Sequence, residues 1–165
     1  MTLQNLLRIG RLKQQASTAA EVQRLLAAID RNLADAEVGA ISVDTRFDAA
    51  YKAIMQCALV ALRAAGYRPS TSEPGHQQTM IQCLPLTLGV DNEAWVVLDA
   101  LRRLRNASDY SGNPITVSAI EECIAQAKSL RQRLHAHLKA RSPDLLLGWA
   151  TTSAKRRSNR PAQGG

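Results

Sequence analysis

The stretch that decides the fold runs Phe47-Asp-Ala-Ala-Tyr-Lys-Ala-Ile-Met-Gln-Cys-Ala-Leu-Val-Ala-Leu-Arg-Ala-Ala-Gly66. Its apolar residues recur at steps of three and four, the period of one face of an α-helix. They are Phe47, Ala50, Tyr51, Ile54, Ala58, Ala61, Leu62 and Ala65. Ser42 is suited to cap the start of this helix and Gly66 to end it. Because many residues on the apolar face are small, neighbouring helices can approach closely, and we predict that this helix is the central one.

Helical periods continue on the N-terminal side. Leucines within residues 1–15 are spaced for a short helix. Thr18-x-x-Glu21 has the form of a capping box and opens a longer helix that reaches Ala36, with Gly39 as a suitable stop. Both segments are therefore predicted to be helical.

Three more helices are predicted on the C-terminal side. One begins near His76 and is kinked or shortened by Pro85. The next is capped by Asp91 or Asn92, and residues 67–75 form the loop before the pair. The last helix is capped by Thr116 or Ser118 and stops at Ser142-Pro143; the apolar patch Leu145–Trp149 that follows could dock on the bundle or on a partner.

These patterns predict an all-α fold, an antiparallel up-down bundle of four to five helices over residues 1–148. No strand pattern and no internal repeat are evident. Residues 149–165 form a polar, basic tail that we expect to be disordered. Its cations could contact phosphate or only promote solubility.

Composition limits the possible functions. The 165 residues suit one domain, and the net charge of +7 includes four cations in the last eleven residues, so the predicted bundle is only mildly basic. Cys57, Cys83 and Cys123 are isolated among apolar residues, without metal-ligand spacing, which indicates buried free thiols in a reducing cytoplasm. No apolar run could span a membrane and no cofactor motif is present. We therefore expect a cytoplasmic protein without a metal or cofactor.

A polar cluster lies near the end of the predicted helix that carries Val97, Leu101 and Leu104 on one face. This helix has an apolar stripe flanked by arginines, Arg102 among them, and is broken by Ser111-Gly-Asn-Pro114. The cluster, Arg105, Asn106, Asp109 and Tyr110, is predicted to lie where the helix ends. A guanidinium can bind a phosphate there, and Asn106 and Tyr110 can add neutral hydrogen bonds. The alternative is a solvated helix face with a capped end.

Two other residues could join this cluster. Tyr51 is either a core aromatic with its hydroxyl at the rim or a residue that lines the site near Arg105. His76, at a helix start, is either a cap or surface group or a source of an imidazole for the site.

Several fragments together resemble the HEPN domain family, helical proteins of prokaryotic toxin–antitoxin and defence systems. The fragments are Leu33-Ala-Asp-Ala36, Arg46-Phe-Asp-Ala-Ala-Tyr51, Ala64-Ala-Gly-Tyr-Arg-Pro69, Gly75-His76 and Leu101-Arg-Arg-Leu-Arg-Asn-Ala-Ser-Asp-Tyr110. The resemblance covers about residues 1–140. It implies a homodimer in which two polar motifs form one cleft.

Active members of that family are metal-independent ribonucleases with an arginine, a following polar residue, and a histidine four to six residues after the arginine. Arg105 and Asn106 match the first part, but Tyr110 stands in the histidine position. A tyrosine with its ordinary pKa of about 10 is only about 0.1% ionised at pH 7, and loss of a general base typically costs about 10²–10⁴ in rate. Ribonuclease activity is therefore expected to be weak or absent.

The sequence thus leads to two hypotheses. The first is a HEPN-like protein of a toxin–antitoxin or defence module that binds RNA or a nucleotide. Arg105 would bind phosphate, with Asn106 and Tyr110 orienting it, Asp109 fixing Arg105 or Tyr110, and Arg102, Tyr51 and His76 nearby. The resemblance also implies an antitoxin or nucleotidyltransferase partner that modifies Tyr110. The second hypothesis is a non-catalytic helical adaptor or partner-binding subunit.

Overall fold

The computed structural model describes residues 1–72 and 74–149. Within these ranges it contains six α-helices, a 3-10 helix (η1) and two short strands. In chain order the elements are α1 (Leu3–Arg8), β1 (Leu12–Gln14), α2 (Ala19–Ala36), α3 (Val43–Ala64), β2 (Tyr67–Pro69), α4 (His76–Thr87), α5 (Asn92–Ser111), α6 (Val117–Arg141) and η1 (Pro143–Leu146). The predicted all-α helical bundle is confirmed.

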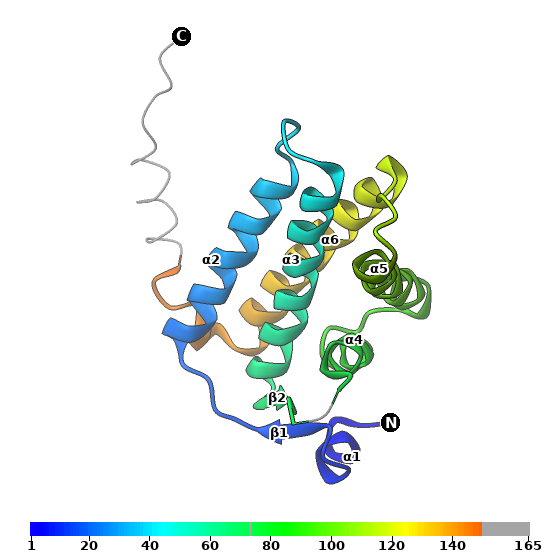
Figure 1. The fold of residues 1–165 in the computed structure, drawn as a ribbon. Coiled ribbons are helices and arrows are strands. Elements are labelled where there is room, and N and C mark those ends of the chain that lie inside the picture. Colours follow the sequence, from blue (N-terminus) through cyan, green and yellow to red (C-terminus); the bar gives the residue numbers. More distant parts are fainter. Residues whose placement is uncertain (73, 150–165) are drawn as a thin grey trace.

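Helix α3 is the centre of the bundle, between α2 and α6 (Figure 1). Eleven of its 22 residues are buried, among them Phe47, Ile54 and Leu62. The rings of Phe47 and Tyr51 stack with their centroids 6.4 Å apart. The apolar period of this segment therefore predicts its central position correctly.

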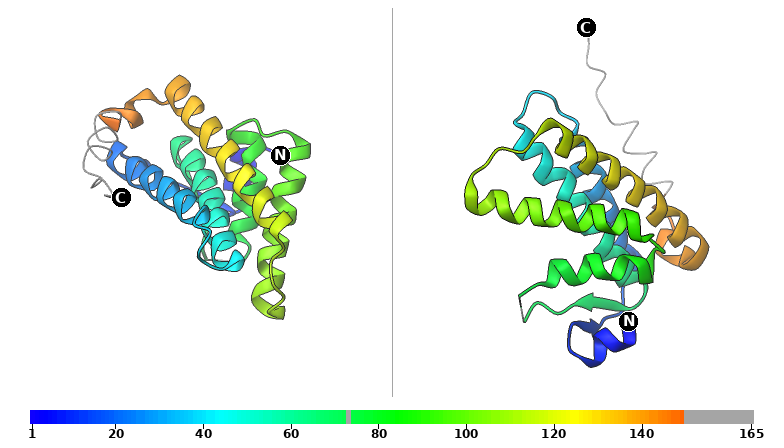
Figure 2. Two further views of the ribbon diagram at one scale, coloured as in Figure 1. Left: turned by 90° about the horizontal axis from the view of Figure 1, so that it is seen from above. Right: turned by 90° about the vertical axis from the view of Figure 1, so that its right-hand side faces the viewer.

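Helices α4 and α5 run across the layer formed by α2, α3 and α6. Figure 1 shows both nearly end-on beside α3 and α6, and Figure 2 shows them from the side. Pro85 lies inside α4 without ending it. The C-terminal part of α5 extends beyond the rest of the bundle, which is clear when the molecule is seen from above (Figure 2, left).

Most predicted helix ends are confirmed. Thr18 and Glu21 form the capping box of α2, and Ser42 and Asp91 cap α3 and α5 through their side chains. Of the two candidates for α6, Thr116 is the cap, with its hydroxyl accepting a bond from the backbone N–H of Ala119. The exception is Gly39, because α2 already ends at Ala36.

The absence of strands was predicted wrongly. Residues 12–14 pair with residues 67–69 in a two-stranded antiparallel ribbon, β1–β2, where a helix and a loop were expected. Leu12 is buried and lies opposite Pro69, so the ribbon covers the end of the core with one apolar pair. Gly66 turns the chain from α3 into β2 with a φ of 90°, a conformation that favours glycine.

The three cysteines are buried free thiols, as predicted, and burial raises the pKa of Cys57 and Cys123 to about 12 and that of Cys83 to about 11. Among the described residues, no helix has the length and apolar character needed to cross a membrane.

The apolar patch after α6 docks on the bundle. The Gln23 side chain on α2 donates hydrogen bonds to the backbone oxygens of Leu145 (3.2 Å) and Leu147 (2.7 Å). The Arg131 guanidinium lies 6.0 Å from the ring centroid of Trp149. The rest of the predicted tail, residues 150–165, lies outside the described residues.

Candidate functional site

Arg105 joins α5 to α3. Its Nε donates to Oδ1 of Asp48 on α3 at 3.0 Å, and its Nη1 donates to Oδ2 of Asp109, one turn further along α5. The Arg105 side chain is 26% exposed, so solvent reaches it beside these two carboxylates. The structure therefore confirms the predicted proximity of Arg105 and Asp109 and adds Asp48.

Helix α5 ends at the predicted breaker, Ser111-Gly-Asn-Pro114. Helix α5 continues through Tyr110 to Ser111 and ends at Gly112, which has a φ of 68°. Arg105 and Asn106 are therefore in the helix body, and only Asp109 and Tyr110 are in its last turn. Within this helix the Ser108 hydroxyl donates back to the Arg105 carbonyl at 3.0 Å.

Tyr110 and Asn106 point away from the core. Tyr110 is 93% exposed, and the Asn106 side chain is also exposed. The structure thus does not bring the phenol against the Arg105 guanidinium within one chain. A site that uses both groups needs a ligand or a partner to connect them.

A buried carboxylate organises the preceding turn of α5. Asp99 is only 7% exposed, and both Nε and Nη2 of Arg102 lie 2.9 Å from its Oδ1. Nε of Arg103 lies 2.9 Å from its other oxygen. The predicted binding residue Arg102 is therefore held by Asp99. Sequence reasoning missed Asp99, although its spacing of three and four residues from two arginines was the available signal.

Tyr51 combines the two predicted alternatives. Its ring is buried in the core, and its hydroxyl donates to Oε1 of Gln77 on α4 at 2.8 Å. Burial raises the pKa of Tyr51 to about 12, although Arg102 and Arg105 nearby favour its ionised form. His76, next to Gln77, is exposed at the start of α4. The Tyr51 hydroxyl thus joins α3 to the end of α4 that carries His76.

The surroundings of Arg105 are acidic. Asp44, Asp48 and Asp109 line a small hollow of about 170 Å³ between the start of α3 and the end of α5. Burial raises the pKa of the Asp48 carboxyl, and Asp109 and Asp44 raise it further, while Arg105 lowers it. A phosphate that binds Arg105 must therefore compete with carboxylates that already neutralise it.

The face of α5 that does not contact the bundle has a regular pattern. Val96, Ala100, Arg103, Ala107 and Tyr110 are all exposed. They follow one another at steps of four, three, four and three residues, the spacing of a helix-pairing seam. Two alanines in the seam leave room for another helix to approach closely. This face is the part of α5 best suited to contact a partner helix.

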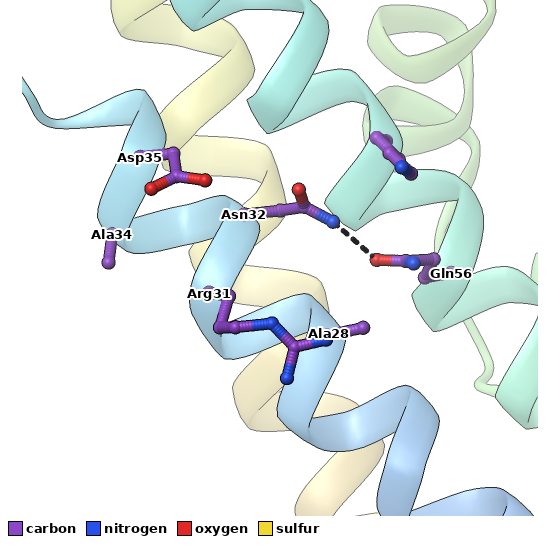
Figure 3. Close-up of a pocket in the computed structure, with 7 residues that line it drawn as sticks. Ala28, Arg31, Asn32, Ala34, Asp35 and Gln56 are labelled. Atoms are coloured by element: carbon purple, nitrogen blue, oxygen red, sulfur yellow. Dashed lines mark hydrogen bonds between the residues drawn. The ribbon is translucent and has the colours of Figure 1, made fainter.

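A separate groove lies between α2 and α3 (Figure 3). Its volume is about 320 Å³, and a 2.8 Å hydrogen bond from Asn32 Nδ2 to Gln56 Oε1 crosses it. Arg31 and Asp35 line it from α2. The groove is on the opposite side of α3 from α5, so it is distinct from the predicted site. None of the residues that line it was a candidate in the sequence analysis.

Within residues 1–72 and 74–149, no group of three or more His, Cys, Asp or Glu side chains is arranged to hold a metal ion. Comparison of the chain with protein-family models, with curated proteins and with solved structures finds no match.

Proposed function

We propose that the chain is a HEPN-like RNA- or nucleotide-binding protein of a toxin–antitoxin or defence module, with weak or absent metal-independent ribonuclease activity. The observation that carries the proposal is the grouping on α5. Arg102, Arg105, Asn106, Asp109 and Tyr110 occupy three consecutive turns of a helix that is largely free of the core and extends beyond the bundle.

The ion pairs of Arg105 fit weak binding better than fast catalysis. A phosphate gains a forked guanidinium contact but must displace Asp48 or Asp109 from it. Exposed and half-exposed ion pairs contribute only about 0–1 kcal/mol, so this exchange is accessible.

Proton transfer is the step that this site performs poorly. Cleavage by the RNA 2′-hydroxyl needs a group that accepts a proton near neutral pH. Tyr110 occupies the position where a histidine would supply it, and phenols as a class are much poorer proton acceptors near neutral pH than imidazoles. The proposal therefore assigns Tyr110 to ligand or partner contact, and its exposure suits modification by a nucleotidyltransferase partner.

The test is expression of the wild type, Arg105→Ala and Tyr110→Phe in a bacterial host, with growth and total RNA integrity measured together. Arg24→Ala is the matched control, because Arg24 is exposed on α2 and has no ion pair in the described part of the chain. We expect slowed growth with little RNA loss in the wild type, and relief of the growth defect by Arg105→Ala but not by Arg24→Ala.

Purified protein completes this test. Binding of a fluorescent single-stranded RNA should weaken at least fivefold in Arg105→Ala, with unchanged circular dichroism. If Arg105→Ala and Tyr110→Phe both match the wild type in growth and in RNA binding, the proposed function is wrong.

A second candidate is a helical adaptor that pairs through α5, as a homodimer or with a partner subunit. The exposed seam that includes Ala100, Ala107 and Tyr110 favours it, since nothing in the bundle covers these residues. Ala107→Glu places a charge in the seam without touching the core. If the wild type is a dimer by light scattering, this variant should be a folded monomer, whereas Arg24→Glu should leave the dimer intact. A wild type that is monomeric at 100 μM or above contradicts pairing with a second copy.

A further inference from the structure

The positive charge of the bundle is concentrated at one end. Of the 21 lysines and arginines, four lie beyond residue 149, which leaves 17 against 14 acidic residues, a net charge of +3. Residues 1–20 and 64–90 contribute four of these cations, Arg8, Arg11, Lys13 and Arg68, and a single acidic residue, Glu73. These two segments include α1, the ribbon β1–β2 and α4. Their net charge of +3 equals the whole net positive charge of residues 1–149.

The ribbon places two of these cations directly opposite each other. Lys13 pairs with Arg68 in the antiparallel register, so both side chains project from the same side. That side is the outer one, because Leu12 and Pro69, the neighbouring pair, are buried on the other. Like charges in directly opposite positions destabilise a strand pair. The native ribbon therefore contains a repulsion that an anion would relieve.

No carboxylate compensates these charges in the described residues. None of the ion pairs within residues 1–72 and 74–149 includes Arg8, Arg11, Lys13 or Arg68. By contrast, most arginines of α5 and α6 are paired with an acid or bonded to backbone oxygens. Arg68 donates to the backbone oxygen of Pro69 at 3.3 Å and Arg8 to Oδ1 of Asn5 at 3.0 Å, both neutral acceptors. An external anion therefore displaces no described carboxylate from these cations, whereas it must displace Asp48 or Asp109 from Arg105.

Other cations extend the patch along the chain. Arg11 lies two residues before Lys13, and its backbone oxygen accepts a bond from Ser70 N–H at 2.9 Å, which continues the ribbon. The Arg11 guanidinium reaches Gly75, with Nη1 3.7 Å from where a Cβ would lie. The patch therefore runs from the ribbon to the start of α4.

We infer that the outer face of the β1–β2 ribbon, with Arg11, Lys13 and Arg68, binds the phosphodiester backbone of a single-stranded nucleic acid. A row of cations spaced along an extended ribbon matches a linear polyanion better than it matches one small anion. Beside the ribbon, the hydroxyls of Ser70 and Ser72 are hydrogen-bonded to each other at 2.8 Å, next to the Arg11 backbone, and hydroxyls can hydrogen-bond phosphate and sugar. This surface is separate from the Arg105 site and does not depend on the function proposed for it.

The test is a titration of the full chain with a fluorescent 20-nucleotide RNA, and with DNA of the same sequence, at several salt concentrations. Lys13→Gln/Arg68→Gln is compared with Arg24→Gln/Lys139→Gln, which removes the same charge from exposed positions on α2 and α6. We expect the ribbon variant to bind about tenfold more weakly at 0.1 M salt, with the slope of log K against log salt reduced by about 1.4, and the control to change little.

Folding does not confound this test, because the ribbon variant removes both opposed cations and with them their repulsion, so its melting temperature should be no lower than that of the wild type. Equal affinity of the ribbon variant and the wild type, or equal losses in both double variants, would overturn the inference. Binding to phosphatidylserine vesicles without binding to RNA or DNA would overturn it as well.

Arg105→Ala, titrated in parallel, separates the two proposals. If only Arg105→Ala weakens binding, the ribbon inference is wrong and the α5 site stands. If only the ribbon variant weakens binding, the ribbon is supported and the α5 site is contradicted.

Discussion

Helices α3 and α5 are of similar length but differ in how they are attached. Eleven of the 22 residues of α3 are buried, against three of the 20 residues of α5: Leu98, Asp99 and Leu101. Apolar contacts on several sides fix α3 in the bundle. Helix α5 buries far fewer apolar side chains, and an ion pair from Arg105 to Asp48 joins it to α3, while Asp99 pairs with arginines of α5 itself. Two helices of one bundle thus have different roles, one as scaffold and one as an accessible polar surface.

The largest expected effect is at the scaffold. Phe47→Ala removes a fully buried ring that stacks on Tyr51, and it should lower the free energy of unfolding by about 3–5 kcal/mol. Leu104→Ala on α5, where the side chain is partly exposed, should cost about 0.5 kcal/mol or less. Urea denaturation measures both. Equal losses would mean that α5 belongs to the core as much as α3 does.

The next effect concerns the buried carboxylate of α5. Asp99→Ala leaves the Arg102 guanidinium, whose side chain is only 13% exposed, without its acceptor, and should cost about 2 kcal/mol. Arg103→Gln removes only the exposed partner and should cost about 0.5 kcal/mol or less, as measured by the same denaturation. If Asp99→Ala leaves the free energy of unfolding unchanged, then Arg102 finds another acceptor and Asp99 does not position it.

Tyr51 on α3, whose hydroxyl donates to Gln77 on α4, gives a pH dependence of stability. Because burial raises its pKa to about 12 in the folded state, the folded chain retains a proton that the unfolded chain loses above pH 10. Its contribution to stability is therefore intact below pH 10 and is lost as the pH rises toward 12, at about 1.4 kcal/mol per unit. Burial also raises the pKa values of the three cysteines, so they too lower the stability of the folded chain as the pH rises above 9.

The variant Tyr51→Phe isolates the tyrosine contribution. It should be less stable at pH 7, because Gln77 loses its hydrogen bond, by about 1 kcal/mol. Its loss of stability between pH 10 and 12 should be smaller than that of the wild type. An identical alkaline slope in both proteins contradicts the assignment.

The smallest predicted effect is a gain in stability. Lys13→Gln removes one of two opposed cations of the ribbon and should stabilise the chain by about 0.2–1 kcal/mol at low salt, with the gain shrinking at 1 M salt. Thermal melts at the two salt concentrations measure it. A loss of stability would mean that Lys13 supports the fold rather than a ligand.

Local signals predicted the scaffold well. The apolar period of α3, the capping box at Thr18 and the cap at Asp91 each depend on residues within a few positions of one another, and each is confirmed. The ribbon was missed because strands of three residues are too short to show an alternating pattern. The signal that remained was Gly66, which turns the chain back after α3.

The candidate site was predictable only in part. The sequence identified Arg105 and Asp109, which are one helical turn apart. It could not identify Asp48, which lies 57 positions earlier and meets Arg105 only because α5 crosses α3. The exposed position of Tyr110 was not predictable either, because it depends on how α5 packs against the other helices.

The central claim of the proposed function is that the free face and C-terminal turns of α5 form a ligand-binding surface, separate from the one inferred for the ribbon. Its most direct test is an amide chemical-shift titration of the isotopically labelled protein with a short single-stranded RNA. We predict that the largest shifts fall within residues 102–113, with Asp48 affected as Arg105 changes partner, and that Arg105→Ala abolishes this set. Shifts confined to the groove between α2 and α3, around Arg31 and Gln56, with α5 unchanged, would contradict the account.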